Sequence, residues 1–277
     1  MTLDIASLNS GSNGNCYYIG NETEAVLIDA GISCRETETR LKRLNLDIKK
    51  IKGVFISHEH KDHISGITVL SKKHQLPVYL TEETHKFAGL RLEKHLIKRF
   101  HEDDPVKIGG LKIKAFTKFH DAGDPHSFTI SSASVTVGVF TDIGTTCHKL
   151  IKHFKKCHAA FLEANYDEDM LTNGDYPFYL KKRITDGRGH LSNNEALDLF
   201  IKHRPEFMSH LILSHLSKNN NTPALVRNLF KDHAGHTQII IASRDEESEI
   251  FYIQPEAQPG KQLTTLIVKN KQQLSLF

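Results

Sequence analysis

The chain has 277 residues, with 39% hydrophobic and 25% charged residues, which is an ordinary composition for a soluble globular protein. Its formal net charge of +3 is too small to require an anionic partner, no apolar run approaches a membrane span of roughly 20 residues, and nothing after Met1 resembles a signal peptide, so we expect a cytoplasmic location. The four cysteines form no C-x-x-C pair, which argues against a zinc ribbon or redox motif, whereas 18 histidines are a clear excess.

Apolar runs and turn residues predict strands over residues 3–8, 16–20, 25–30 and 54–56, and helices over 35–44 and 64–74. Residues 10–15 are Ser, Gly and Asn, which favour a turn whose backbone amides could hold an anion. A possible helix over 84–100 would carry a basic stripe, formed by Arg91, Lys94 or His95, and Lys98.

In the second half, strands are predicted over 111–116, 126–130, 135–140, 161–162 and 211–213, with 238–242 as the last core strand. Helices are predicted over 193–202 and 223–230. Two β-rich segments flanked by helices indicate an α/β fold with two packed sheets and helices outside. We expect one hydrolase domain over residues 1–254 and a polar tail over 255–277.

A metal-ligand pattern follows the strand at 54–56, in His58-x-His60-x-Asp62-His63. A loop at the end of a strand can fold these side chains together, whereas a regular strand would divide them between two faces. Imidazoles and a carboxylate packed so densely are costly to bury without a cation. The residue types and their spacing therefore favour a metal site over a solvated charged loop.

This pattern resembles the signature of the metallo-β-lactamase superfamily, whose remaining motifs are matched in chain order by Asp29, His120, Asp142 and His215. The resemblance covers roughly residues 1–245 and implies a four-layer αββα sandwich. It implies two divalent metal ions, with Zn²⁺, Mn²⁺ and Fe²⁺ all suited to nitrogen and oxygen donors.

The resemblance assigns His58, His60 and His120 to the first metal ion. It assigns Asp62, His63 and His215 to the second ion, with Asp142 as the bridge between the two. Asp29 resembles the early aspartate that orients the loop. His126 follows His120 by six residues and is the alternative third histidine, although only His120 matches the motif position.

Two further segments, Glu163-Ala164-Asn165 and His190-Leu191-Ser192, resemble motifs of the tRNA 3′-processing branch of the fold. There a glutamate orients a histidine that protonates the leaving oxygen, since an alkoxide needs a proton to leave. The catalytic residues implied here are Asp62, Glu163 and His190. Basic residues at 181–183 and Arg188 precede His190 and are expected to contact phosphate, although a solvated helix face would look the same.

The runs at 10–15, 120–125 and 214–221 together resemble the bacterial WalJ/YycJ-type metallohydrolases. This implies a 5′→3′ exonuclease acting on DNA in repair or replication. An RNA-processing nuclease of the same fold and a thioester or lactam hydrolase are the alternatives, and a non-enzymatic clamp or DNA adaptor is a further one.

The last five residues, Gln273, Leu274, Ser275, Leu276 and Phe277, match the pentapeptide with which bacterial replication and repair proteins bind the DNA sliding clamp. The match lies at a free end behind a polar segment, where it could reach a partner. A terminal strand is the alternative, because residues 263–268 are β-forming. The sequence therefore predicts two partners, DNA and the sliding clamp.

Overall fold

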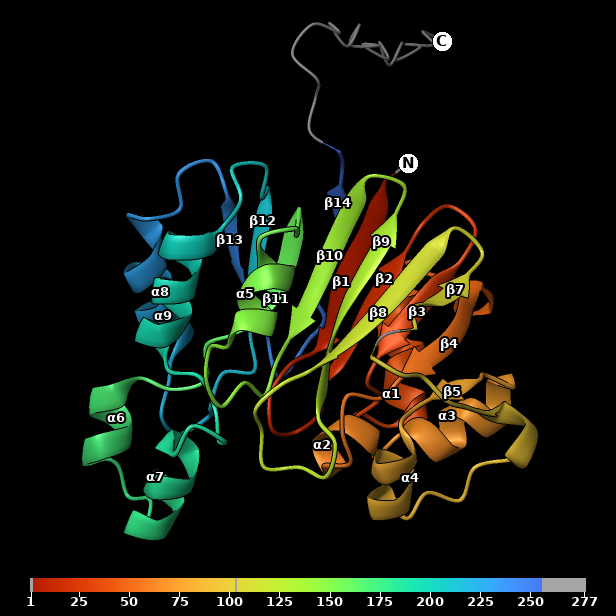
Figure 1. Ribbon diagram of the computed structural model, residues 1–277, viewed down its shortest axis with the longest axis horizontal. Helices are drawn as coiled ribbons and strands as arrows, with labels where there is room; N and C mark the ends of the chain where they lie inside the picture. Colours follow the sequence, from red (N-terminus) through yellow and green to blue (C-terminus); the bar gives the residue numbers. More distant parts are fainter. Residues whose placement is uncertain (1, 103, 256–277) are drawn as a thin grey trace, which may run out of the picture.

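The computed structural model describes residues 2–102 and 104–255, which form two sheets packed face to face with helices on both outer sides (Figure 1). The predicted four-layer αββα sandwich is thereby confirmed. Within the described residues, no helix has the length and apolarity needed to cross a lipid bilayer.

The first sheet contains seven strands, which in spatial order are β14 (Phe251–Ile253), β1 (Leu3–Asn9), β2 (Cys16–Gly20), β3 (Ala25–Ile28), β4 (Ile51–Phe55), β5 (Val78–Tyr79) and β6 (Ile97–Lys98). The second sheet also contains seven, in the order β13 (Gln238–Ile241), β12 (His210–Ser214), β11 (Ala159–Glu163), β10 (Val135–Phe140), β9 (His126–Ser132), β8 (Leu111–Thr117) and β7 (Val106–Ile108).

The helices that follow strands of the first sheet are α1 (Cys34–Arg43), α2 (Lys61–Ile64), α3 (Ile67–His74) and α4 (Glu82–Ala88). Those in the second half are α5 (His148–Phe154), α6 (Glu168–Asn173), α7 (Phe178–Thr185), α8 (Asn193–His203) and α9 (Pro223–Lys231). Short 3₁₀ turns span Ile48–Lys50 and Lys94–Leu96.

Side-chain alternation along the strands separates three apolar layers. In β2, Tyr17 lies in the central cluster between the sheets, whereas Tyr18 lies in the cluster between the first sheet and its helices. A third cluster fills the space between the second sheet and α8 and α9, where Phe200 meets Phe230. Each sheet is thus buried on both faces, so a functional site can form only at the ends of its strands.

The prediction of one helix over 84–100 was wrong. Helix α4 ends at Ala88 because Gly89 takes a left-handed conformation (φ 60°), and the chain then extends until Ile97 pairs with Val78 of β5. The predicted basic stripe is therefore not a helix face.

The prediction that 238–242 forms the last core strand was also wrong. Strand β14 pairs antiparallel with β1 and places Ile253 opposite Leu3. A strand of three residues carries too little periodicity to be recognised by itself.

The topology gathers the carboxyl ends of several strands at one edge of the sandwich. Strands β10, β11 and β12 are parallel neighbours, so the residues after them lie together. Those residues are Asp142, Glu163 and His215, and the end of β4 brings His58 to the same edge from the other sheet.

Candidate metal centre

The histidine run folds into a tight loop between β4 and α2, where His60 occupies the N-cap position. The backbone of Asn15 donates to the Asp62 carbonyl at 2.7 Å, and that of Ala30 donates to the His63 carbonyl at 2.8 Å. A Cβ at Gly31 would overlap the Asp62 carbonyl oxygen, so the loop packs against a residue that must be glycine.

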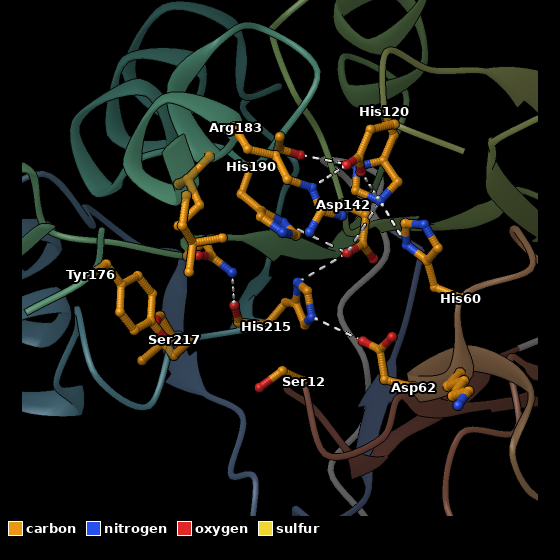
Figure 2. Close-up of a pocket in the computed structure, with 17 residues that line it drawn as sticks. Ser12, His60, Asp62, His120, Asp142, Tyr176, Arg183, His190, His215 and Ser217 are labelled. Carbon is orange, nitrogen blue, oxygen red and sulfur yellow. Dashed lines mark hydrogen bonds and ion pairs between the residues drawn. The ribbon is translucent and has the colours of Figure 1, made fainter. Parts of the chain in front are cut away.

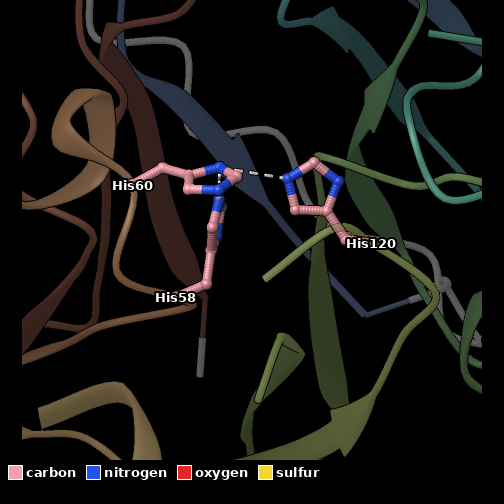
Figure 3. Close-up of side chains that lie close together, drawn as sticks. All are labelled: His58, His60 and His120. Carbon is pink, nitrogen blue, oxygen red and sulfur yellow. Dashed lines mark hydrogen bonds between the residues drawn. The ribbon is translucent and has the colours of Figure 1, made fainter. Parts of the chain in front are cut away.

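Three histidines direct ring nitrogens at one another (Figure 3). Nδ1 of His60 lies 3.1 Å from Nε2 of His58 and 3.3 Å from Nε2 of His120. The Nδ1–H group of His120 donates to the Gly189 carbonyl at 2.9 Å, which leaves Nε2 free as a ligand atom. Burial lowers the pKa of His120 to about 4 and that of His58 well below its usual range, so both rings are neutral.

A second group consists of Asp62, His63 and His215. Oδ2 of Asp62 lies 3.3 Å from Nε2 of His63. The same oxygen lies 3.5 Å from Nε2 of His215 (Figure 2). Asn15 holds the same carboxylate oxygen through its side-chain amide at 3.1 Å. Burial opposes ionisation of Asp62, but the neighbouring charge of His63 and the hydrogen bonds keep the pKa of that carboxyl well below its usual range.

Asp142 lies between the two groups. Its Oδ2 is 3.1 Å from Nε2 of His63, and its Oδ1 is 3.3 Å from His215 and 4.0 Å from His120. Oδ2 is buried and has no partner with good hydrogen-bond geometry among the described residues, although it lies in ion-pair range of the His63 ring. When His63 is neutral, as a metal ligand must be, this anionic oxygen is costly to bury unless a metal cation neutralises it.

The donor set fits divalent cations. Tetrahedral zinc with Zn–N bonds of about 2.0–2.1 Å would place two ligand nitrogens roughly 3.3 Å apart, close to the spacings around His60. All seven predicted ligands lie within these groups, and they contribute nitrogen and oxygen but no thiolate. Their individual roles remain predictions.

Asp29 follows the end of β3, adopts a left-handed backbone conformation (φ 62°), and stabilises the histidine-rich loop between β4 and α2. Its carboxylate accepts from the backbone and hydroxyl of Ser57 at 2.8 and 2.9 Å, and from Nδ1 of His63 at 2.7 Å. The bond to His63 turns Nε2 of that ring toward Asp62 and Asp142. These contacts agree with the orienting role expected for Asp29.

Glu163 is buried at the end of β11 and joins two histidines. Its Oε1 accepts from Nδ1 of His190 at 2.8 Å and from Nδ1 of His215 at 2.9 Å, while Oε2 accepts from the backbone of Ile143 and Leu191. Burial opposes ionisation, but the charge of His190 and these bonds hold the pKa of Glu163 at about 2. The pairing with His190 was expected, whereas the pairing with His215 was not.

Sequence reasoning also missed Lys118, a buried lysine beneath the centre. Its Nζ donates to the Thr141 carbonyl at 2.6 Å, and burial lowers the pKa of this amine. Its position two residues before His120 was the only available signal, because a lysine at the end of a strand is normally exposed.

His126 does not belong to the cluster. Its Nδ1–H donates to the Asp124 carbonyl at 2.9 Å, and its ring meets Phe100 edge-on with centroids 5.2 Å apart. The structure therefore brings His120, and not His126, to the other ligands.

The predicted anion-binding run has other partners. Ser10 accepts from the His215 backbone at 2.8 Å, and the side chain of Asn15 holds Asp62. Both side chains position predicted ligands, so these two are not free to hold an anion, whereas Ser12 lines the cavity and anion binding by the backbone amides stays a prediction.

A cavity of about 350 Å³ opens onto the centre. His60, Asp62, His120, Asp142, His190 and His215 line its floor, and Ser12, Tyr176, Arg183 and Ser217 are among its other lining residues (Figure 2). Of the predicted phosphate contacts, Arg183 is paired with Asp121 at 2.5 Å and Lys181 donates to the Thr172 carbonyl at 2.7 Å, whereas Lys182 and Arg188 are exposed.

Residues 24–215 match the model of the beta-lactamase superfamily domain. The chain is 33% identical to exodeoxyribonuclease YycJ of Bacillus anthracis, over 82% of this chain and 87% of the relative, and 30% identical to exodeoxyribonuclease WalJ of Streptococcus pneumoniae, over 79% and 83%. Among solved structures, the metallo-beta-lactamase fold protein YhfI from Bacillus subtilis superposes with a TM-score of 0.72 at 19% identity, covering 91% of this chain and 100% of that one, which shows a shared fold.

Proposed function

Because this chain belongs to the beta-lactamase superfamily, and to its WalJ/YycJ-type branch, we propose that it is a metal-dependent exonuclease that acts on DNA. Membership of the superfamily makes it a hydrolase whose fold implies divalent metal ions. The two relatives named exodeoxyribonuclease support the choice of DNA over a thioester or a lactam.

The observation that carries the proposal is the Glu163–His190 pair beside the metal centre. Nδ1 of His190 is engaged by Glu163 at 2.8 Å, so Nε2 is the free nitrogen of a ring that lines the cavity. A histidine held in this orientation can donate a proton to an alkoxide leaving oxygen. Hydrolysis of a thioester has less need of this donor, because a thiolate leaves readily, whereas the release of a sugar hydroxyl as an alkoxide requires a proton.

Divalent ions bound by the two groups would activate water and hold the oxygens of the displaced phosphate. Around them, Asp29 and Glu163 keep His63 and His215 oriented, and Asp142 supplies a carboxylate oxygen to both sides. We assign catalytic roles to Asp62, Glu163 and His190. Asp62 would act as a ligand of the second metal ion, and Glu163 would orient His190, the proton donor.

We further propose two ions per chain, zinc or manganese, and digestion in the 5′→3′ direction during DNA repair or replication. Such an enzyme would meet its substrate in the cytoplasm. The nitrogen and oxygen donors suit both metals, and Lys182 and Arg188 offer exposed charge for phosphates near the cavity.

The clamp motif at 273–277 lies outside the described residues, and we retain it as a proposal resting on the sequence alone. We likewise retain the division into a hydrolase domain over 1–254 and a tail over 255–277. Deleting Gln273 to Phe277 should leave the nuclease rate and melting temperature unchanged and abolish binding to purified clamp. A lower melting temperature together with no clamp binding by the intact chain would contradict recruitment.

The deciding experiment compares end-labelled duplex DNA, single-stranded DNA and RNA, each with Mn²⁺ and with Zn²⁺. We expect stepwise loss of nucleotides from DNA, with label release from the 5′ end preceding release from the 3′ end. Faster degradation of RNA would favour the RNA-processing alternative. Cleavage of thioesters or lactams with no cleavage of nucleic acid would overturn the proposal.

A further inference from the structure

One wall of the cavity is apolar, in contrast to the charged floor. Tyr176, Leu180 and Ile184 line this wall, and all three side chains are half-buried. Figure 2 shows the Tyr176 ring beside Ser217, across the cavity from His60. A ligand that carries an apolar group as well as a group for the metal centre would match both surfaces of the cavity.

The wall is held in a defined position. Tyr176 lies in the turn between α6 and α7, directly before Pro177 at the N-cap of α7. Its hydroxyl accepts from the Asn219 side chain at 3.1 Å, and Asn219 belongs to the segment that follows His215. The ring is thus fixed relative to a predicted metal ligand.

The apolar face of helix α7 lines the cavity and does not pack into the hydrophobic core. Leu180 and Ile184 are one turn apart, so they share a face, and both line the cavity. None of the residues of α7 is buried. Apolar side chains left half-exposed beside charged residues are understandable if a ligand covers them.

We propose that Tyr176, with Leu180 and Ile184, forms a subsite for the base of the nucleotide whose 3′ oxygen leaves. The inference rests on the proposed nuclease function and adds where the nucleotide sits. A flat ring stacks on any base, so the subsite requires a base without selecting its identity. The cavity volume of about 350 Å³ lies within the range of small-ligand sites.

The side of the scissile bond follows from His190. In Figure 2 His190 lies between Tyr176 and Asp142, so the proton donor is on the Tyr176 side of the centre. When the P–O3′ bond breaks, water supplies the new oxygen on phosphorus and O3′ takes the proton from His190. The sugar that carries O3′, and therefore its base, belongs on the Tyr176 wall.

The test uses oligonucleotides with one abasic residue, placed either at the nucleotide that carries the leaving 3′ oxygen or at the next nucleotide. For the wild-type protein, we expect kcat/KM to fall roughly 10-fold to 100-fold with the first substrate and much less with the second. Tyr176→Ala should be slow on the natural substrate and lose this discrimination. Tyr176→Phe keeps the ring and should retain it.

Phe178→Ala is the matched control, because Phe178 is an aromatic residue of α7 that is 80% exposed and does not line the cavity. It should discriminate like the wild-type protein. If Tyr176→Ala slows natural and abasic substrates equally, Tyr176 has only a structural role and the subsite is refuted. If the wild-type protein cleaves no oligonucleotide at all, the nuclease proposal and this inference both fail.

Discussion

The floor and the apolar wall of the cavity are built in different ways. Floor residues such as Asp142 and His215 are almost fully buried, and each follows closely after the end of a strand. Helix α7, in contrast, has no buried residue and touches the cavity with one face only. Three of the six non-glycine residues with positive φ in the described part of the chain, Asp29, Asp142 and His215, lie in or next to the metal centre.

This difference indicates a division of labour. Non-glycine residues with positive φ cost free energy and persist only where the surrounding structure holds them, which the paired sheets do here. A segment with little burial can change in sequence without disturbing the core. We infer that the chemistry depends on the sheets and that binding of the substrate's base depends on α7 and the turn before it.

Replacing Asp142 with alanine should have the largest effect. The carboxylate lies between both groups, so its loss should abolish activity and lower the number of bound metal ions per chain. Metal analysis and the DNA assay on the same preparation measure both effects. A wild-type protein that is fully active with only one metal ion bound per chain would refute the two-ion centre.

His190→Ala should slow cleavage of the DNA phosphodiester by roughly 10²–10⁴, the usual contribution of a general acid, with metal content unchanged. A substrate with a nitrophenolate leaving group needs little protonation and should lose much less. Equal losses on both substrates would assign His190 to binding or structure instead.

Gly31→Ala tests how strictly the floor is packed. The added Cβ must displace the Asp62 carbonyl, so we expect a loss of about 1–3 kcal/mol in the free energy of unfolding and weaker metal binding by roughly 10–100-fold. Gly89→Ala is the control for crowding, since nothing lies within 4 Å of its Cβ, and its positive φ, which Gly31 does not share, adds only a local backbone cost. It should cost about 1 kcal/mol and leave metal affinity unchanged. Equal behaviour of the two variants would mean that the loop adjusts freely.

Lys182→Ala should have the smallest effect. Lys182 is an exposed cation of α7 next to Arg183, and losing one phosphate contact should raise KM a few-fold at low salt and reduce the salt slope by about one. Lys231→Ala removes an exposed charge from α9, away from the cavity, and should not change either quantity. If KM and the salt slope change equally in both variants, the effect comes from the net charge of the protein and not from a phosphate contact of Lys182.

Most residues of the cavity floor could be predicted from the sequence, whereas the apolar wall could not. The histidine run is local in the chain and follows a recognisable strand, so its place in the fold could be predicted. The double use of Glu163 by His190 and His215 could not, because it depends on β11 and β12 being parallel neighbours. The burial of Lys118 and the existence of β14 could not be predicted either, because both depend on contacts with distant parts of the chain. The partner strand of β14, for example, is at the other end of the chain. Helix α7 was missed because it has a weak apolar pattern and packs against a cavity, not a core.

The pairing of β14 with β1 has a practical consequence for handling the protein. Ile253 lies opposite Leu3, whereas the other end of β1 leads to Ser10, which binds the His215 backbone in the centre. A strand of seven residues is roughly 23 Å long, so Ile253 lies about that far along β1 from the end that leads to Ser10. A sensor surface or bead coupled beyond Ile253 should therefore leave the cavity open to long DNA, and an immobilised enzyme should digest at the rate of the free one.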